Sequence, residues 1–118
     1  MGVQAETRLQ QRIQRLIKSR GGYVHKNWGN MTSAPGVADL TVCYKGKYLV
    51  LEVKEGDNTP SSAQGIHCRN VYRAGGLAAV VWCIEEVDII LNAIDSLDDN
   101  KLIRGRIIAL GIDDGTRW

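Results

Sequence analysis

Apolar positions in the first twenty residues follow the period of a helix. Between Val3 and Arg20 they recur every three or four residues, at Ala5, Leu9, Ile13, Leu16 and Ile17. The pair Gly21-Gly22 is a typical helix stop, so we expect the helix to end there. The next residues, 23 to 28, predict a short strand, and a loop rich in Gly, Asn, Ser and Pro then runs to Gly36.

The middle of the chain has the pattern of a hairpin followed by a helix. Two strands are predicted over residues 37 to 44 and 47 to 54, joined tightly at Lys45-Gly46. A polar loop, EGDNTP, leads to Ser61 or Ser62 as the N-cap of a helix. That helix is expected to end at Gly75-Gly76.

The last third continues the alternation of strands and helices. Residues 77 to 84 form a continuous apolar run, which predicts a strand buried on both faces. Glu85 and Glu86 favour the start of a helix, whose apolar positions are Val87, Ile90, Leu91, Ile94 and Leu97. A last strand is predicted over residues 102 to 110, and the ending GIDDGTRW is predicted to be a loose tail. The order of elements predicts an α/β fold with a mixed sheet.

The turn at Lys45-Gly46 fixes which residues of the hairpin face each other. A two-residue turn pairs Tyr44 with Lys47, so Asp39 lies opposite Glu52. One sheet face then carries Leu40, Val42, Leu49, Leu51 and Val53, and the other carries Asp39, Thr41, Val50, Glu52 and Lys54. A slip by one residue would mix apolar and polar side chains, so the hydrophobic pattern favours this register.

The predicted register places two acids side by side. Their Cβ atoms would be ~5 Å apart, which is unfavourable for like charges unless a cation lies between them. Mg²⁺ or Mn²⁺ would suit such oxygen ligands. Lys54, on the same face, could hold or deprotonate an attacking water and stabilise charge on a phosphate. The alternative is an ordinary turn residue at Asp39 and an exposed ion pair between Glu52 and Lys54, but the combination favours a metal site.

Glu6 lies on the apolar side of the first helix. On a helical wheel it falls about 60° from Leu9, between Ile13 and Ile17, so it faces the sheet. A carboxylate so placed needs a partner, such as a metal or a metal-bound water. An acid in a frayed first turn is the other interpretation, and the residues alone leave both open.

The charge of the chain is compatible with nucleic-acid binding but does not by itself indicate it. The chain has 15 Lys and Arg against 13 Asp and Glu. Six of the cations precede residue 27, namely Arg8, Arg12, Arg15, Lys18, Arg20 and Lys26. They could follow a phosphate backbone or form a solvated helix face.

Trp28 could stack on a splayed base, although capping a core edge is favoured, and Trp82 is predicted to be core.

Several classes of site and location are not indicated by the sequence. The three cysteines form no CxxC pair, so neither a disulfide framework nor a zinc site is predicted. His25 and His67 lack metal-ligand spacing. No stretch approaches the ~20 apolar residues needed to cross a bilayer, and an intracellular, cytoplasmic protein without a membrane partner is expected.

Together, several short motifs resemble one nuclease family. They are PGVADL at 35 to 40, VLEVK at 50 to 54, PSSAQ at 60 to 64 and RAGG at 73 to 76, with Glu6 on the first helix. An acid followed by Glu-x-Lys occurs in many unrelated strands, but the whole set is specific. It resembles the PD-(D/E)XK nuclease superfamily and, within it, the VRR-NUC (virus-type replication-repair nuclease) domains, over residues 5 to 82.

The resemblance implies a fold and a set of site residues. The fold would be restriction-endonuclease-like, with a helix-βββ-helix-β core whose mixed sheet is flanked by helices, in a single nuclease domain spanning 1–118. Asp39 and Glu52 would bind Mg²⁺ or Mn²⁺, helped by the backbone carbonyl of Val53, while Lys54 would act on the water. Glu6 would be the helix carboxylate, acting on the metal directly or through water, and Gln64 the polar residue that opens the second helix.

The resemblance also implies an activity. We expect a metal-dependent, structure-selective DNA endonuclease acting on branched duplexes such as Holliday junctions, as a homodimer and without an organic cofactor. A stand-alone, phage-type member is expected, because the accessory domains of the Fanconi-associated nuclease are absent from this sequence. Two alternatives remain: a non-catalytic DNA-binding or assembly module of the same fold, and a restriction-type, sequence-specific endonuclease. The intact Asp-Glu-x-Lys set argues against the first, and 118 residues leave the second little room for recognition loops.

Overall fold

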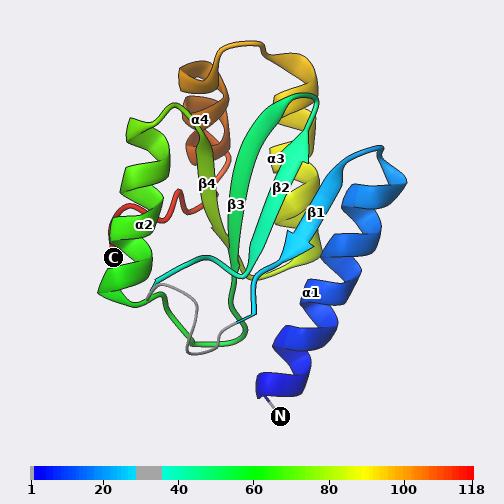
Figure 1. Cartoon of the computed structure of the whole chain (residues 1–118), viewed down its shortest axis with the longest axis vertical. Helices are drawn as coiled ribbons and strands as arrows, with labels where there is room; N and C mark the ends of the chain where they lie inside the picture. Colours follow the sequence, from blue (N-terminus) through cyan, green and yellow to red (C-terminus); the bar gives the residue numbers. More distant parts are fainter. Residues whose placement is uncertain (1, 29–35) are drawn as a thin grey trace.

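A four-stranded mixed sheet forms the centre of the computed structural model, which describes residues 2–28 and 36–118 (Figure 1). The strands are β1 (Tyr23–Lys26), β2 (Leu40–Tyr44), β3 (Lys47–Val53) and β4 (Leu77–Val81), in that spatial order. β2 is antiparallel to both of its neighbours, β1 and β3, whereas β4 is parallel to β3. The parallel pair requires a crossover, which the helix between β3 and β4 provides.

Helices cover both faces of this sheet. The larger core lies on one face, where α1 (Gly2–Ser19), α3 (Ile84–Ser96) and α4 (Asn100–Ala109) contribute buried isoleucines, valines and leucines. A smaller cluster under α2 (Ser62–Arg73) on the other face consists of Ala38, Val50, Cys68, Val71 and Ala78. In residues 2–28 and 36–118, no helix has the length and apolar character that crossing a bilayer requires.

The hairpin adopts the predicted register. Tyr44 pairs with Lys47, Cys43 with Tyr48 and Thr41 with Val50. The turn residues Lys45 and Gly46 both have positive φ, 52° and 78°, as a type I′ turn requires. Leu40, Val42, Leu49, Leu51 and Val53 are all fully buried in the larger core, so the predicted core face is confirmed.

The strand predicted over residues 102 to 110 is wrong, because this segment forms α4. Asp99 caps the helix by accepting hydrogen bonds from the backbone N–H groups of Lys101 and Leu102. Ile103 and Ile107, one helical turn apart, are fully buried. This spacing is helical, and Leu102, beside Ile103, is exposed on another side of the helix.

The C-terminal tail is not loose, which corrects a second prediction. Its Ile112 is buried, and the backbone N–H of Val80 donates to the carbonyl of Asp113 at 2.8 Å. The indole N–H of Trp118 donates to Asp113 Oδ2 at 3.0 Å. The tail thus covers part of the outer edge of β4, an edge that would otherwise present unpaired backbone groups.

Two of the three tryptophans, Trp28 and Trp82, also differ from their predicted roles. Trp28 is 67% exposed, with the Lys26 ammonium 4.5 Å from its ring centre, so it does not cap the core edge. Trp82 is only half-buried, and its indole N–H donates to the carbonyl of Asn58. Neither indole ring is therefore part of the buried core. For Trp82, the apolar residues around it had predicted burial.

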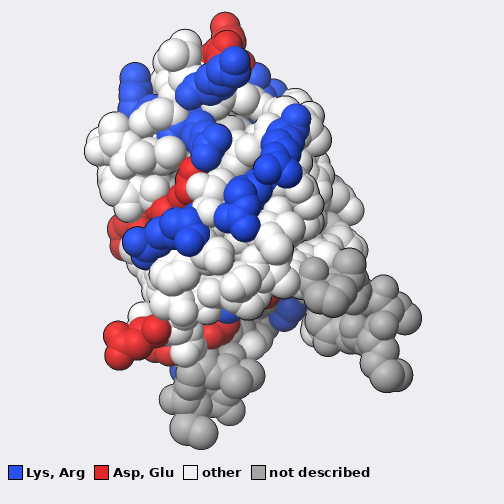
Figure 2. Space-filling model, turned by 90° about the vertical axis from the view of Figure 1, so that its left-hand side faces the viewer, with Lys and Arg blue, Asp and Glu red and all other residues white. Residues whose placement is uncertain are grey.

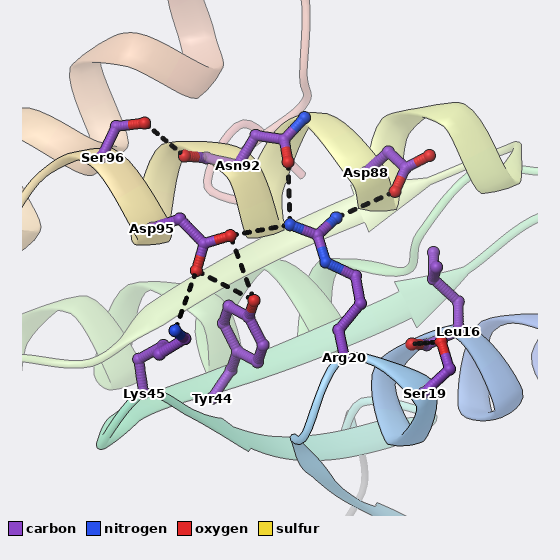
Figure 3. Close-up of polar contacts among 9 residues, drawn as sticks. All are labelled: Leu16, Ser19, Arg20, Tyr44, Lys45, Asp88, Asn92, Asp95 and Ser96. Atoms are coloured by element: carbon purple, nitrogen blue, oxygen red, sulfur yellow. Dashed lines mark hydrogen bonds and ion pairs between the residues drawn. The ribbon is translucent and has the colours of Figure 1, made fainter.

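A polar network joins α1, β2 and α3 on the larger-core side (Figure 3). The Arg20 guanidinium, just after α1, donates to Asp88, Asn92 and Asp95, which lie along α3. The Tyr44 hydroxyl donates to the same Asp95. The Tyr44 hydroxyl, together with Arg20 and Lys45, outweighs the opposing effect of burial and holds the pKa of Asp95 below its ordinary value. Arg20 is therefore engaged within the protein, unlike the exposed Arg8, Arg12, Arg15 and Lys18.

Candidate active site

Asp39 and Glu52 meet at the end of β3 that lies beside the start of α2. Asp39 is the residue before β2, one position beyond the last pair of the hairpin, Leu40 with Leu51. The backbone N–H of Val53 donates to Asp39 Oδ2 at 2.8 Å. The register therefore continues to the predicted placement of Asp39 opposite Glu52, and the contact with the Val53 N–H is an additional finding.

Glu52 is buried and only partly paired. It is 1% exposed, and the Lys54 ammonium lies 3.1 Å from its Oε2. The side-chain amide of Gln64 donates to the same oxygen. Oε1, by contrast, is buried with no hydrogen-bond partner. One carboxylate oxygen is thus held by two donors, and the other is left unsatisfied.

The environment keeps both acids from ionising easily. Burial, followed by the charge of Asp39, raises the pKa of Glu52 to about 7 against the opposing effect of Lys54. Burial also raises the pKa of Asp39, against the Val53 N–H and Lys54, which favour its charged form. Both carboxylates are therefore harder to ionise than in water, chiefly because they are buried and secondarily because each lies near another acid.

The donors present fit a divalent cation. Both side chains offer carboxylate oxygens, and the Val53 backbone lies between Glu52 and Lys54 in the chain. Mg²⁺ and Mn²⁺ prefer such oxygen ligands and typically take one or two carboxylates. A cation here would satisfy the orphaned Glu52 Oε1 and favour the ionised form of both acids.

Glu6 approaches this pair without joining it. Its side chain is half-buried on α1, and its Oε2 accepts a hydrogen bond from the Asn58 amide at 3.1 Å. Its charge is among the effects that raise the pKa of Asp39. Across residues 2–28 and 36–118, no three His, Cys, Asp or Glu side chains form a group that could hold a metal ion. Asn58 therefore supplies the polar partner that the sequence required for Glu6.

Gln64 connects the first turn of α2 to Glu52. Ser61 is the N-cap, and its side chain accepts from the Gln64 backbone N–H. The Gln64 side-chain oxygen in turn accepts from the Ser61 N–H, which completes a capping box. The same side chain donates to Glu52 through its amide nitrogen. The helix cap thereby fixes the orientation of a glutamate on the neighbouring strand.

Asn27 is a site residue that the sequence did not reveal. Its backbone N–H donates to the carbonyl of Asp39 at 2.8 Å. Its side-chain amide donates to the Ala38 carbonyl at 3.0 Å and to the Thr41 hydroxyl at 2.8 Å. Asn27 follows β1, whose Lys26 pairs with Leu40, so only the register of β1 places it against Asp39.

The two histidines lie apart from these carboxylate contacts. His25 is exposed on β1. His67 is half-buried on α2, and burial lowers its pKa. Neither histidine forms a hydrogen bond or ion pair with Asp39, Glu52 or Lys54 among the contacts of the described residues.

The fold matches solved nuclease structures. A VRR_NUC domain superimposes with a TM-score of 0.62 at 25% sequence identity, over 74% of this chain and 94% of that one. The Holliday junction resolvase Hjc of Archaeoglobus fulgidus superimposes with a TM-score of 0.53 at 18% identity, over 65% of this chain and 67% of that one. No family model and no curated protein matches the sequence. The predicted resemblance to VRR-NUC domains and the predicted fold class are confirmed at the level of structure.

Proposed function

We propose that this chain is a single-domain, metal-dependent DNA nuclease of the PD-(D/E)XK type, with its centre at Asp39, Glu52 and Lys54. The observation that carries the proposal is the buried Glu52, which contacts Lys54 and Gln64 through one oxygen and leaves the other unpartnered. The likeness to a VRR_NUC domain over most of that domain's length supports the same reading.

Each residue has a definable role in phosphodiester hydrolysis. Asp39, Glu52 and the Val53 carbonyl would hold Mg²⁺ or Mn²⁺, and such an ion supplies Lewis acidity and lowers the pKa of water. Lys54 places an ammonium group where a phosphate would gain negative charge, and it can orient the attacking water. Gln64 keeps Glu52 in place, and Glu6 adds a further carboxylate that we propose acts through water.

Branched DNA and a homodimer are the finer parts of the proposal. Hjc, with which the chain shares its fold, is described as a Holliday junction resolvase. Two centres related by a twofold axis would suit paired cuts in a symmetric branched substrate. A catalytically silent DNA-binding module is the second candidate, and the same experiment separates it from a nuclease.

A cleavage assay tests the centre directly. Labelled four-way, flap and linear duplexes are incubated with the parent protein, Asp39→Asn and Lys54→Ala, with Mg²⁺, Mn²⁺ or a chelator. We expect the parent to cut the branched substrates, and each variant to lose at least about a hundredfold in rate, because each removes a ligand or a positive charge at the reacting phosphate. Chelation is expected to abolish cutting.

A matched variant controls for charge. Asp57→Asn makes the same change as Asp39→Asn at an exposed loop position and should cut like the parent. Cutting by Asp39→Asn and Lys54→Ala at the parent's rate would refute the assigned centre. Junction binding without any product at all metal concentrations would favour the silent module, and one defined cut on linear DNA would favour a restriction-type enzyme.

A further inference from the structure

Three arginines line one cavity between α2, α4 and the C-terminal tail. The cavity has a volume of about 370 Å³ and is lined by Arg69, Tyr72, Arg73, Arg104 and Thr116. Figure 2 faces the side on which α2 lies in Figure 1, and Lys and Arg side chains gather over the middle of that side. The cavity is separate from the carboxylate centre, with which it shares no residue.

The positive charge of this cavity is only partly neutralised. Arg104 forms an ion pair with Asp114 at 2.7 Å and stacks on the Tyr72 ring at 3.9 Å. Arg69 donates to the carbonyl of Thr116, which carries no charge. Among the ion pairs of the described residues, none includes Arg69 or Arg73. Three guanidinium groups are therefore balanced by one carboxylate.

Two of these arginines repel each other, and a bound anion would reduce that repulsion. Arg69 and Arg73 lie one helical turn apart on α2, where like charges repel each other. A neighbouring cavity of about 350 Å³ shares Tyr72 and Arg104 and adds Lys101 and the acid Asp99, so the excess of positive charge is confined to the first cavity. Guanidinium groups pair with phosphate oxygens through two parallel hydrogen bonds, which makes phosphate the anion best suited to them.

We propose that this arginine surface, formed by Arg69, Arg73 and Arg104, binds phosphates of the DNA backbone at a distance from the cleavage centre. The proposal rests on DNA being the substrate. Arg73 lies about 13 Å further along α2 than Gln64 and about 180° around that helix, given a rise of 1.5 Å and a turn of 100° per residue. A contact at that distance would orient the arm whose phosphate enters the centre.

The test measures DNA binding without cleavage. The full chain carrying Lys54→Ala is titrated with a labelled linear duplex and a labelled four-way junction in a chelator, at several salt concentrations. We expect Arg73→Gln to raise the Kd about fivefold and to reduce the slope of log K against log salt by about 1, since one phosphate contact is lost. Arg73→Lys keeps the charge and should recover most of the affinity.

The control is another arginine on the same part of the molecule. Arg106 is exposed on α4, about 200° around that helix from Arg104, and does not line the cavity. Arg106→Gln removes the same charge and should bind DNA as the parent does, with an unchanged salt slope. Equal losses in Arg73→Gln and Arg106→Gln would overturn the proposal, because they would reflect net charge alone.

Two further outcomes separate this proposal from its rivals. Binding of inorganic phosphate that is lost in Arg73→Gln, together with an unchanged Kd for DNA in that variant, would assign the cavity to a free phosphate and overturn the backbone contact. A parent that cuts DNA while Arg73→Gln binds normally would refute the arginine surface and leave the nuclease proposal standing. A parent that binds DNA through Arg73 but never cuts it would refute the nuclease proposal and leave DNA binding by the arginine surface standing.

Discussion

Asn27 holds the backbone on both sides of Asp39 and so sets where that carboxylate lies. Its three hydrogen bonds end on the Asp39 carbonyl, the Ala38 carbonyl and the Thr41 hydroxyl. Asn27 touches neither carboxylate through its own side chain, so we regard it as a positioning residue. Groups that orient a metal ligand typically affect metal affinity by ten- to a hundredfold when removed.

Asn27→Ala is therefore expected to raise the Mg²⁺ concentration for half-maximal cutting about tenfold while retaining much of the rate at saturating Mg²⁺. A purely structural role would lower the melting temperature and leave this metal requirement unchanged. Asn70→Ala, which removes an exposed amide from α2, is the control and should match the parent. The measurement is a metal titration of the cleavage rate, with thermal unfolding in parallel.

The relation between Asp39, Glu52 and Lys54 could be predicted from the sequence because it depends on local geometry. A two-residue turn fixes the hairpin register, and the register fixes the facing residues. Asn27 and Asn58 could not be found in this way. Their partners depend on how β1 and the loop after β3 pack against the hairpin, and no periodic pattern encodes those contacts.

Among the elements, α2 is tied to the tail by a close backbone contact at Gly65. A Cβ atom at this position would lie 2.4 Å from the backbone carbon of Trp118. Gly105, in the interior of α4, would meet nothing within 4 Å. The two glycines thus offer the same substitution in two helices, with opposite steric consequences.

We expect Gly105→Ala to raise the free energy of unfolding by about 0.5–1 kcal/mol, because alanine loses less backbone entropy in a helix. Gly65→Ala should lower it by about 1–3 kcal/mol, since the tail must move away from α2. Denaturant unfolding of the parent and both variants measures these free energies of unfolding. A stabilising Gly65→Ala would mean that the tail does not pack on α2 as the structure has it.

Asp114 links the tail to α4 and makes that link dependent on pH. Burial tends to raise its pKa, but the Arg104 guanidinium and the Thr116 N–H and hydroxyl outweigh burial and hold the pKa below the ordinary value. An acid whose pKa is lower in the folded than in the unfolded protein stabilises the fold above its unfolded pKa, near 4. That stabilisation is lost as the pH falls through the lower, folded pKa.

Asp114→Asn should therefore be less stable than the parent at pH 7, and the difference should shrink as the pH falls below about 4. Denaturant unfolding between pH 7 and pH 3 measures it. Asp88→Asn, at a more exposed ion pair with Arg20, is the comparison and should change stability less. A difference for Asp114→Asn that stayed constant with pH would exclude this carboxylate as its source.

Among the elements, the wrong prediction is the strand over residues 102 to 110, where the apolar residues are compatible with either a strand or a helix. Residues 102 to 110, LIRGRIIAL, contain six apolar residues interrupted by Arg-Gly-Arg, and the sequence predicts a strand there. Asp99 as an N-cap, with Ile103 and Ile107 one turn apart, was the signal for a helix. The tail could not be predicted, because single long-range contacts such as Val80 with Asp113 hold it in place.

For the whole molecule, the predicted helix-βββ-helix-β core was correct because each of its elements carries its own start, stop and periodicity. Gly21-Gly22, Lys45-Gly46, Ser61 and Gly75-Gly76 lie at its boundaries. Those boundaries also bring the candidate ligands together. Asp39 precedes β2, Glu52 lies in β3 and Gln64 lies in α2, so the site exists only when the hairpin and the crossover helix are folded together.

A metal ion at this site should therefore stabilise the folded protein as a unit. The folded chain offers the two carboxylates together, whereas the unfolded chain does not. At a hundredfold excess over Kd, binding to the folded state alone adds about 2.7 kcal/mol, which corresponds to a rise in Tm of roughly 10 °C for a domain of this size. Thermal unfolding in Mg²⁺ or Mn²⁺, without DNA, measures this rise independently of catalysis.

Two variants with the same charge change make this experiment specific. Asp39→Asn should lose most of the metal-induced rise in Tm, whereas Asp57→Asn, in the exposed loop after β3, should keep it. An equal rise in both variants would indicate that the ion binds elsewhere on the surface. No rise in the parent at millimolar metal would contradict a divalent-cation site at Asp39 and Glu52, because an ion that binds only the folded protein must raise its Tm. The buried, unpartnered Glu52 Oε1 would then remain without a ligand.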